Sequence, residues 1–318
     1  MISDADLYRQ LPNVLTHTNC GFLGERYEGK VRDNYTRGDV RVLITSDRLS
    51  CFDVVVTTVP FKGQVLTELA AYWFDRSRDI IANDILDLPD PNVMVVRNCA
   101  VFPVEIVVRA YLTGSAWRDY QAGRAISGVV LPAGLRPSEK LPEIIITPST
   151  KAAKGSHDAP ISEEEIVSSS LVDRKTWAQA REAALALFAM GQVEAEKSGL
   201  ILVDTKYELG LYQGKLMLVD EIHTLDSSRY WVQESYKRCF LSGESPEMLD
   251  KEPTRQWLLS QGYMGNGPIP EFTETHRLQI ARHYISAFER ITHREFSGEV
   301  APVATRIEAR MKQYRMPT

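Results

Sequence analysis

The chain has 318 residues, of which 44% are hydrophobic and 25% are charged, as expected for a globular protein with one or two domains. Its formal net charge is −5 and its basic residues are scattered, which argues against nucleic acid or an anionic membrane as the main partner. The four cysteines lie far apart and form no CxxC pair, which indicates free thiols in a reducing compartment. We find no signal-peptide pattern and no apolar run near the roughly 18 residues of a membrane span, so a cytoplasmic protein is expected.

The first predicted element is a strand, a glycine turn and a second strand between residues 21 and 46. Gly29, Lys30, Val31 and Arg32 lie at the bend. Glycine allows a close approach of the backbone to a ligand, and two basic side chains two residues apart point the same way and can meet phosphate oxygens. The pattern is neither a Walker A loop nor GxGxxG. A solvated hairpin tip is the alternative explanation.

A polar segment, SDRLSCFD at residues 46–53, follows the second of these strands. It contains Asp47, Ser50 and Asp53, and ligand contacts are often found directly after a buried strand. The alternative is a turn in which Asp and Ser side chains bond the local backbone. Another strand at 54–59 and a helix at 63–81 are predicted next.

Two strand-like runs between residues 92 and 108 are broken at Pro103, and Arg109 and a Thr-Gly-Ser segment ending at Ser115 follow. A guanidinium, a hydroxyl and backbone amides together can hold an anion, although a simple turn has a similar sequence. Residues 123–165 are rich in Gly, Pro and Ser and are predicted to be a loop. Its 147–158 part is a candidate lid, and His157 is predicted to be a surface residue.

A helix at 173–197, ended by Gly199, leads into a predicted β-hairpin between residues 200 and 231. Asp204, Lys206 and Glu208 alternate along its first strand, which places their side chains on one face. Gly210 and Gln213-Gly214 supply turn residues, and the second strand ends at Asp220. Carboxylates gathered in this way can hold Mg²⁺ together with substrate phosphates, whereas a solvated strand face with Lys206 paired to its neighbours is the alternative.

The register of this hairpin gives a condition. For Glu208 and Asp220 to share a face, the turn between the strands must contain an odd number of residues or a bulge. A two-residue turn at Gln213-Gly214 would place them on opposite faces.

The last third of the chain contains a second hydroxyl-and-arginine turn, with Asp226, Ser228 and Arg229. Lys251 and Arg255 open a predicted helix, a loop follows at 262–270, and a final helix is predicted at 273–293. Anion-binding side chains thus alternate with carboxylates at strand ends and turns. This combination favours a site for a nucleoside triphosphate, Mg²⁺ and a second anionic substrate.

Two longer motifs carry a specific resemblance. Residues 101–115, VFPVEIVVRAYLTGS, resemble the PxExxxRxxxxGS signature of the SAICAR synthetase family, and residues 202–210, LVDTKYELG, resemble its DxKxEFG signature. The segments GKVRD, SDRLSCFD, TPSTK, LVDEIHTLDSSRYW and LDKEPTR agree in the same order, so that the resemblance covers nearly the whole chain in its longer form. Leu209 and Phe102 depart from the usual residues, but both are apolar and neither is expected to disturb the chemistry.

The resemblance implies an α+β, ATP-grasp-like fold with two lobes. Residues 1–110 would form an N-terminal, antiparallel β-rich lobe that binds nucleotide, and residues 111–318 a larger α+β lobe with the metal and substrate sites and the C-terminal helices. The implied reaction joins the carboxylate of carboxyaminoimidazole ribonucleotide (CAIR) to the amine of L-aspartate. ATP is consumed and SAICAR, ADP and phosphate are formed, with an acyl phosphate as the expected intermediate.

The resemblance also implies residue roles. Gly29, Lys30, Val31, Arg32 and Val101 would bind ATP, Val101 through its backbone beside adenine. Lys206, Glu208 and Asp220 would be catalytic and touch ATP, with Glu208 and Asp220 holding Mg²⁺. The substrate-binding residues would be Asp47, Ser50, Asp53, Arg109, Ser115, Asp226, Ser228, Arg229, Lys251 and Arg255.

Two alternatives remain at this point. One is a different ATP-grasp ligase or a kinase-like phosphotransferase; a kinase would show an HRD-type base and a DFG motif, which the sequence lacks. A nucleotide-binding module without chemistry would lack the metal acids or the lysine, which are present. The sequence leaves open the oligomeric state, the order of substrate binding and the residues that hold L-aspartate, with His157-Asp158 as one candidate.

Overall fold

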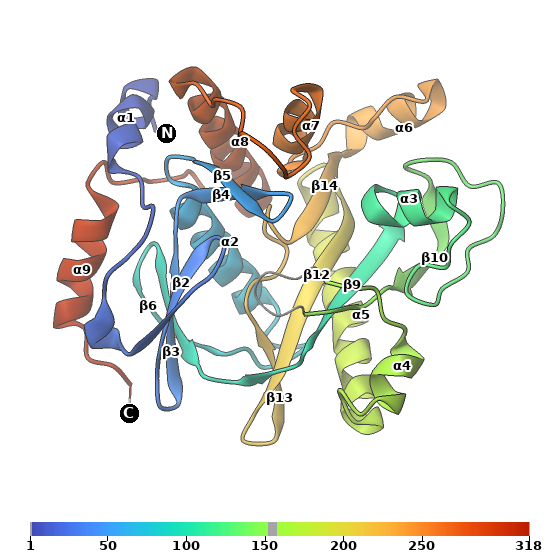
Figure 1. The fold of residues 1–318 in the computed structure, drawn as a ribbon, viewed down its shortest axis with the longest axis horizontal. Helices are drawn as coiled ribbons and strands as arrows, with labels where there is room; N and C mark the ends of the chain where they lie inside the picture. Colours follow the sequence, from blue (N-terminus) through green and yellow to red (C-terminus); the bar gives the residue numbers. More distant parts are fainter. Residues whose placement is uncertain (1, 152–157, 318) are drawn as a thin grey trace. The chain divides into compact units, whose positions relative to one another are not determined.

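A computed structural model describes residues 2–151 and 158–317. The chain forms two compact units (Figure 1). Unit 1 contains residues 1–72, 84–98 and 250–318, and unit 2 contains residues 73–83 and 99–249. This division differs from the predicted boundary at residue 110, because the C-terminal helices pack with the N-terminal strands while residues 99–110 pack with the middle of the chain.

Unit 1 is built on a five-stranded antiparallel sheet in the order β1-β2-β3-β7-β6. Its strands are β1 (Glu25–Glu28), β2 (Arg32–Arg37), β3 (Val40–Thr45), β6 (Ile85–Asp90) and β7 (Val93–Arg97). A separate hairpin consists of β4 (Arg48–Cys51) and β5 (Val54–Thr58). The helices of unit 1 are α1 (Asp4–Gln10), α7 (Glu252–Ser260), α8 (Glu274–Thr292) and α9 (Val303–Gln313), and α2 (Lys62–Arg76) contributes residues to both units.

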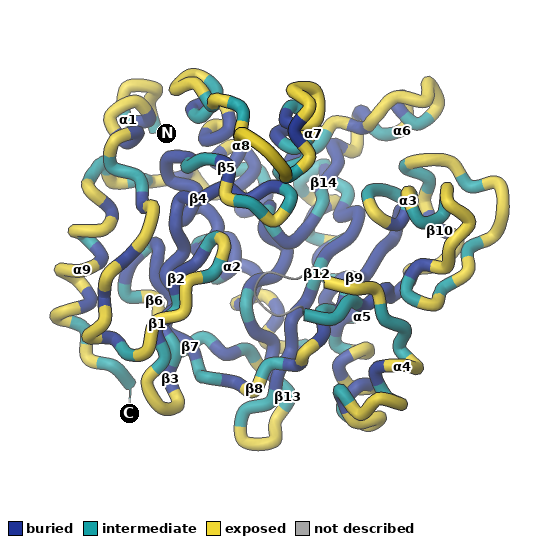
Figure 2. The backbone as a smooth tube through the Cα atoms, viewed as in Figure 1, coloured by how far each residue is buried: buried dark blue, intermediate teal, exposed yellow. Residues whose placement is uncertain are grey.

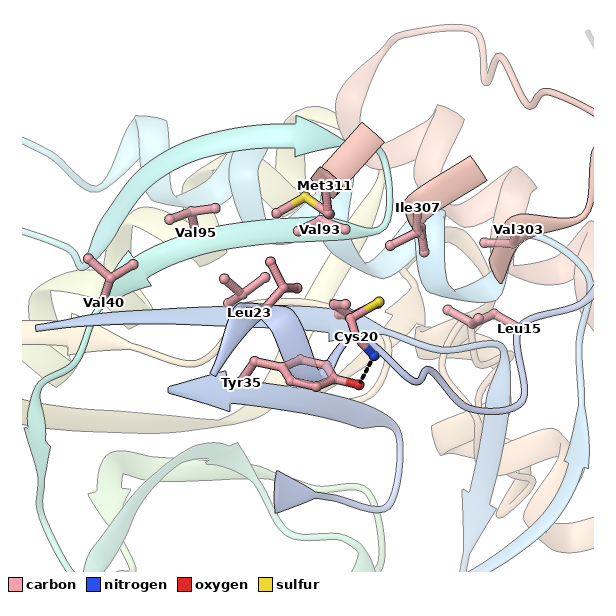
Figure 3. Packing of buried hydrophobic residues seen from close by; sticks show 12 residues of the cluster. Leu15, Cys20, Leu23, Tyr35, Val40, Val93, Val95, Val303, Ile307 and Met311 are labelled. Atoms are coloured by element: carbon pink, nitrogen blue, oxygen red, sulfur yellow. Dashed lines mark hydrogen bonds between the residues drawn. The ribbon is translucent and has the colours of Figure 1, made fainter. Parts of the chain in front are cut away.

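The two faces of this sheet are covered by different helices because the side chains of a strand alternate. Val42 and Ile44 of β3 pack with Ile307 of α9 in the core that Figure 3 shows. Leu43, between them in sequence, packs on the other face with Ala70 of α2. The C-terminal helix α9 therefore completes the core of unit 1, a role that the sequence did not predict.

Unit 2 is built around β12 (Leu200–Tyr212), which is buried along most of its length (Figures 1 and 2). The other strands of its sheet are β8 (Ala100–Val101), β9 (Val104–Tyr111), β10 (Lys140–Ile146), β11 (Ser149–Thr150), β13 (Lys215–Val219) and β14 (Ser228–Val232). The first half of β12 pairs with β9 and β14, and its second half pairs with β13 and β8. All these pairings are antiparallel, in agreement with the predicted α+β class.

The helices of unit 2 are α3 (Gly114–Gln121), α4 (Glu163–Ser168), α5 (Arg174–Lys197) and α6 (Gln233–Ser242). The long helix α5 packs against β12 and β9. Asp173 caps its N-terminus by accepting hydrogen bonds from the backbone N–H groups of Lys175 and Thr176, which confirms the predicted helix almost to the residue. No helix in residues 2–151 and 158–317 is long and apolar enough to cross a membrane.

Gly210 is not a turn residue, which corrects the sequence prediction. It lies inside β12, where it pairs with Val101 of β8 and Met217 of β13. A Cβ atom on Gly210 would lie 2.7 Å from the backbone oxygen of Ala100, so that any other residue would push β8 away. The glycine therefore permits close approach of two strands rather than reversal of the chain.

Candidate active site

The predicted charged face of β12 exists, and strand β9 adds to it. Asp204, Lys206 and Glu208 occupy alternate positions of β12, where Asp204 pairs with Arg109 and Lys206 with Val107. Since side chains two residues apart share a face, Glu105 and Arg109 of β9 extend on the same side of the sheet as these three. The two strands thus carry a lysine with acidic neighbours at one end of the shared face and an arginine with an aspartate at the other.

At the first end, carboxylates converge on one ammonium group. Nζ of Lys206 lies 2.5 Å from Oε1 of Glu208, 3.2 Å from Oε1 of Glu105 and 3.6 Å from Oδ2 of Asp220. Lys151, directly after β11, forms a second ion pair with Glu208. We call Glu105, Lys151, Lys206, Glu208 and Asp220 the carboxylate–lysine cluster. It contains three acids and two bases.

Burial and charge act in opposite directions on this cluster. Burial alone would lower the pKa of Lys206, but Glu208, Asp220 and Glu105 outweigh it and hold the pKa well above the usual value. Burial alone would raise the pKa of Glu208, but Lys206 and Lys151 lower it to about 2. The pKa of Glu105 is raised, chiefly by burial. At neutral pH, Lys206 is therefore cationic and Glu208 is ionised.

Asp220 lies on the same side of the hairpin as Glu208, but for a reason that the sequence did not predict. The turn has two residues, Gln213 and Gly214, and Glu208 pairs with Val219. A further paired residue at position 220 would point away from Glu208. Strand β13 ends at Val219, however, and Asp220 has a φ of +70°, which takes it out of the strand. The stated requirement for an odd turn or a bulge is therefore wrong, because a left-handed residue at the strand end meets the same need.

At the second end, three charged residues form one row across three strands. Asp204 of β12 pairs in register with Arg109 of β9 on one side and Arg229 of β14 on the other. Its Oδ2 accepts hydrogen bonds from Nη1 of Arg109 at 2.7 Å and from Nη1 of Arg229 at 2.5 Å. We call these three residues the arginine row. Two guanidinium groups share one carboxylate, so the row keeps an excess positive charge.

The surroundings of the arginine row are shaped to admit these large side chains. Arg109 is buried and also donates to Oγ1 of Thr147 at 2.8 Å and to Oγ of Ser115 at 3.4 Å. A Cβ atom on Gly114, which has a φ of +59°, would lie 2.6 Å from Nη2 of Arg229. The Thr-Gly-Ser segment therefore lies against both arginines. The structure brings together the predicted residues Arg109, Ser115 and Arg229.

Other predicted residues of unit 2 lie elsewhere. The Ser228 hydroxyl hydrogen-bonds that of Thr205 at 2.7 Å, and Thr205 belongs to the opposite face of β12 from Asp204 and Lys206. Asp226 lies in the preceding turn, where its backbone N–H donates to Oγ1 of Thr224. Val101 belongs to β8 and pairs with Gly210, two residues beyond Glu208.

In unit 1, the predicted glycine turn is present between β1 and β2. The backbone N–H of Gly29 donates to the carbonyl of Arg32 at 2.8 Å. The side chain of Lys30 is largely exposed and lies 2.5 Å from Oδ1 of Asp53, whereas Arg32 is buried. The two basic side chains of the turn thus have different surroundings.

The SDRLSCFD segment contacts the rest of unit 1 more than the sequence suggested. Asp47 is fully buried, and its carboxylate accepts hydrogen bonds from the backbone N–H groups of Leu15 and Gly63 at 2.7 and 2.9 Å. Burial raises the pKa of Asp47 to about 6 against the effect of these bonds. Ser50 is buried in β4. The Asp47 carboxylate therefore links the backbone of three segments of unit 1 and has a structural role.

The tip of the β4–β5 hairpin is strained and supported from the C-terminal part of unit 1. Phe52 and Asp53 both have positive φ angles, +53° and +64°, which are unfavourable for residues with a side chain. The guanidinium of Arg255 stacks 4.8 Å from the centre of the Phe52 ring, and a Cβ on Gly265 would lie 2.9 Å from Cβ of Phe52. Lys251 precedes α7, and Arg255 belongs to it.

Glu105 and Lys151 have no role predicted from the sequence, although both belong to the quoted motifs, and Asp204, predicted as one of the gathered carboxylates, pairs with Arg109 and Arg229 instead. Strand alternation around Arg109 would have placed Glu105 on the charged face. Lys151 gave no local signal, because its contact with Glu208 spans 57 positions. His157, the other candidate in that loop, lies outside the described residues, and Asp158 is exposed.

A cluster that gathers carboxylates beside a cationic row on one sheet is typical of enzymes that bind phosphorylated substrates together with a cation. The family model of SAICAR synthetase matches residues 25–268, and the chain belongs to this family. It is 46% identical over 303 residues to phosphoribosylaminoimidazole-succinocarboxamide synthase of Bacteroides fragilis, and the match covers 93% of this chain and 96% of that one. The enzyme of the same name from Legionella pneumophila is 42% identical over 306 residues, covering 93% of this chain and 97% of that one.

Solved structures agree. SAICAR synthase from Saccharomyces cerevisiae, complexed with SAICAR, superposes with a TM-score of 0.79 at 30% identity, covering 89% of this chain and all of that one. The predicted fold class, family and activity are therefore confirmed: the chain is an ATP-dependent ligase of purine biosynthesis, which joins CAIR and L-aspartate.

Proposed function

We propose that the carboxylate–lysine cluster is the place where the CAIR carboxylate is activated, with Mg²⁺ bound by Glu208 and Asp220. The observation that supports this proposal most strongly is the contact of the Lys206 ammonium group with three carboxylates at 2.5 to 3.6 Å. The cluster holds three acids and two lysines in a mostly buried place, and an added cation would offset the charge of the ionised carboxylates.

The donor set fits Mg²⁺. Among the described residues, no three or more His, Cys, Asp or Glu side chains are arranged as ligands of a metal ion. Mg²⁺ is usually bound by one or two carboxylates completed by water and substrate phosphates, so two acids are sufficient. When bound, the ion would neutralise charge on the phosphate groups of ATP. Glu208, ionised at neutral pH, is ready to act as a ligand without first losing a proton.

The chemistry requires an activated carboxylate because oxide is a poor leaving group. A carboxylate oxygen of CAIR attacks the γ-phosphorus of ATP, the bond to the β-phosphate oxygen breaks, and ADP leaves. The neutral amine of L-aspartate then attacks the acyl carbon, the bond to the phosphate oxygen breaks, and phosphate leaves while the nitrogen gives up a proton. Lys206 would stabilise the charge that passes between the groups. Positioning and charge neutralisation supply this catalysis without a protein nucleophile.

The other proposed substrate contacts are assigned from the charged and polar side chains of each unit. The arginine row and Ser115 would hold the phosphate of CAIR, because Arg109 is fixed by Asp204 and Arg229 remains partly exposed. In unit 1, the glycine turn would contribute to binding the phosphates of ATP, and Ser50, Asp53, Lys251 and Arg255 would contact substrate. In unit 2, Asp226 and Ser228 would support the turn that carries Arg229, and the backbone of Val101 would meet adenine.

We also propose that the protein acts in the cytoplasm. Its four cysteines, Cys20, Cys51, Cys99 and Cys239, are all buried and form no disulfide, as expected for a reducing compartment.

An isotope experiment tests the activation step. CAIR carrying ¹⁸O in its carboxylate is turned over with ATP and L-aspartate, and the released phosphate is analysed by mass spectrometry. We expect one ¹⁸O atom in each phosphate, because the oxygen that attacks phosphorus leaves with it. Unlabelled phosphate would refute phosphorylation of the carboxylate.

A further inference from the structure

The glycine turn, residues 29–32, has all four of its carbonyl groups occupied by neighbours in unit 1. The carbonyls of Gly29 and Lys30 accept hydrogen bonds from Nη2 and Nε of Arg48 at 3.0 and 2.9 Å. The carbonyl of Val31 accepts from both the backbone N–H and the hydroxyl of Ser46, at 2.9 and 2.7 Å. The carbonyl of Arg32 accepts from the N–H of Gly29, which closes the turn.

The occupied carbonyls fix the direction of the amides. In a planar trans peptide the C=O of one residue and the N–H of the next point in opposite directions. Since the carbonyls of Gly29 and Lys30 point toward Arg48, the N–H groups of Lys30 and Val31 point away from it. Among residues 2–151 and 158–317, neither of these two N–H groups has a hydrogen-bond partner. Successive backbone N–H groups that point the same way form a concave site for an anion.

The side chain of Arg48 is fixed by several further hydrogen bonds. Its side chain is only 7% exposed, and its Nη2 also lies 2.9 Å from Oδ1 of Asp33, which is 1% exposed. Oδ2 of Asp33 accepts hydrogen bonds from the backbone N–H and the hydroxyl of Thr18 at 2.6 and 2.8 Å. Nη1 of Arg48 donates to the carbonyl of Thr16. Four of the five N–H groups of this guanidinium thus donate to partners in unit 1, which fixes the orientation of its plane.

We infer that Arg48 and Ser46 are positioning residues that clamp the carbonyls of the glycine turn and thereby present the N–H groups of Lys30 and Val31 to the phosphates of a nucleotide. The inference rests on the proposed binding of ATP phosphates by this turn. It assigns a function to the SDR part of the SDRLSCFD segment, whose polar residues the sequence suggested as direct ligand contacts. Arg48 acts through the backbone of the turn and does not touch the substrate.

The substitution Arg48→Lys tests the clamp, because lysine keeps the charge but cannot reach several carbonyls with a fixed planar fork. Arg306→Lys is the matched control. The Arg306 side chain is 8% exposed in the same unit, and it donates two hydrogen bonds to Asp90 and one to Asn92 instead of to the turn. Binding of ADP and of adenosine is measured by titration calorimetry, and folding is checked by thermal unfolding.

We expect Arg48→Lys to weaken ADP binding about tenfold, the equivalent of one or two hydrogen bonds, and to change adenosine binding less than about twofold. Arg306→Lys should leave both affinities within about twofold. Equal weakening by the two variants, or ADP binding by Arg48→Lys within twofold of the unsubstituted protein, would overturn the clamp. If Arg48→Lys does not fold, ADP binding is measured for Ser46→Ala instead. Binding about threefold weaker would support the clamp, and unchanged binding would overturn it.

A third variant separates this inference from the proposed function. Lys30→Ala removes a side chain of the turn without touching its carbonyls. If Lys30→Ala weakens ADP binding and Arg48→Lys does not, the turn binds phosphate but the clamp is wrong. If neither Lys30→Ala nor Arg48→Lys alters ADP binding, the turn itself is not a phosphate site.

Discussion

Nζ of Lys206 and Oδ2 of Asp220 lie 3.6 Å apart, although the pairing of β12 with β13 assigns positions 206 and 220 to opposite faces. The left-handed backbone of Asp220 at the end of β13 resolves this conflict. Asp and Asn tolerate this conformation better than other residues with a side chain. The position therefore combines a backbone requirement with a charge requirement, and substitutions can separate the two.

Asp220→Asn should keep the fold and lose activity. Asparagine tolerates the left-handed conformation, so the melting temperature should stay within a few degrees, but the lost charge should lower kcat by about 100-fold or more. Asp220→Ala loses the charge and in addition strains the backbone, by roughly 1 kcal/mol. Thermal unfolding and steady-state kinetics of both variants measure the two effects. Full activity of Asp220→Asn would contradict a role for its carboxylate.

Glu208→Gln should strongly lower kcat with the fold retained. The amide cannot replace the ionised oxygen that faces Lys206 and Lys151, and we expect kcat to fall by about 100-fold or more at saturating Mg²⁺. Glu194→Gln is the control, because Glu194 lies in the same unit and also between two cations, Lys197 at 2.6 Å and Arg76 at 3.8 Å. Its kcat should be unchanged. Equal kinetics for Glu208→Gln and Glu194→Gln would remove Glu208 from the mechanism.

The two arginines of the arginine row should differ in their effects. Arg109 is buried, so that Arg109→Met leaves the carboxylate of Asp204 with a single partner and should destabilise unit 2 by about 3 kcal/mol. The Arg229 side chain is 22% exposed, and Arg229→Met should cost about 1 kcal/mol or less. Both variants should raise the KM for CAIR and leave that for ATP nearly unchanged. An unchanged KM for CAIR in Arg229→Met would contradict the assignment of the phosphate.

His223 should make the stability of unit 2 depend on pH. Burial lowers its pKa to about 3, and the neutral ring hydrogen-bonds the Tyr207 hydroxyl through Nε2 at 2.6 Å. Because the pKa is lower in the folded state, the stability is fully present above pH 6.5 and is lost as the pH falls toward 3. From this group alone, the free energy of unfolding should decrease by about 1.4 kcal/mol per pH unit below pH 6.

The variant His223→Gln tests this dependence. Unfolding by urea is followed from pH 8 to pH 5 for both proteins. The variant should be less stable at pH 8, and its stability should fall less steeply below pH 6. Parallel curves for the two proteins would show that His223 does not titrate on unfolding.

The sequence predicts the parts of this structure whose signals are local. Alternation gave the charged face of β12, and helical spacing with a capping aspartate gave α5. The helix α8 also begins and ends within one residue of its predicted bounds. Arg109, Ser115 and Arg229 were grouped by their chemistry and by family resemblance, and they lie together in unit 2.

Features that depend on distant contacts were not predictable. The hydrophobic residues of α9 match a face of a sheet more than 200 positions earlier, so nothing near them indicates their role. Gly210 looks like a turn residue, and only the proximity of β8 explains it. The SDR segment has the composition of a ligand site, but the side chains of Ser46 and Arg48 donate to backbone carbonyl groups, whose direction a sequence does not show.

Cleavage of ATP by this ligase should be coupled to the joining of CAIR and L-aspartate. ADP release by the purified protein is measured with ATP and Mg²⁺, with each of the two other substrates omitted in turn. We predict rapid ADP release, with SAICAR formed in equal amount, only when CAIR and L-aspartate are both present. Sustained ADP release at the same rate without CAIR, or SAICAR formation without ATP, would show that the two reactions are not coupled.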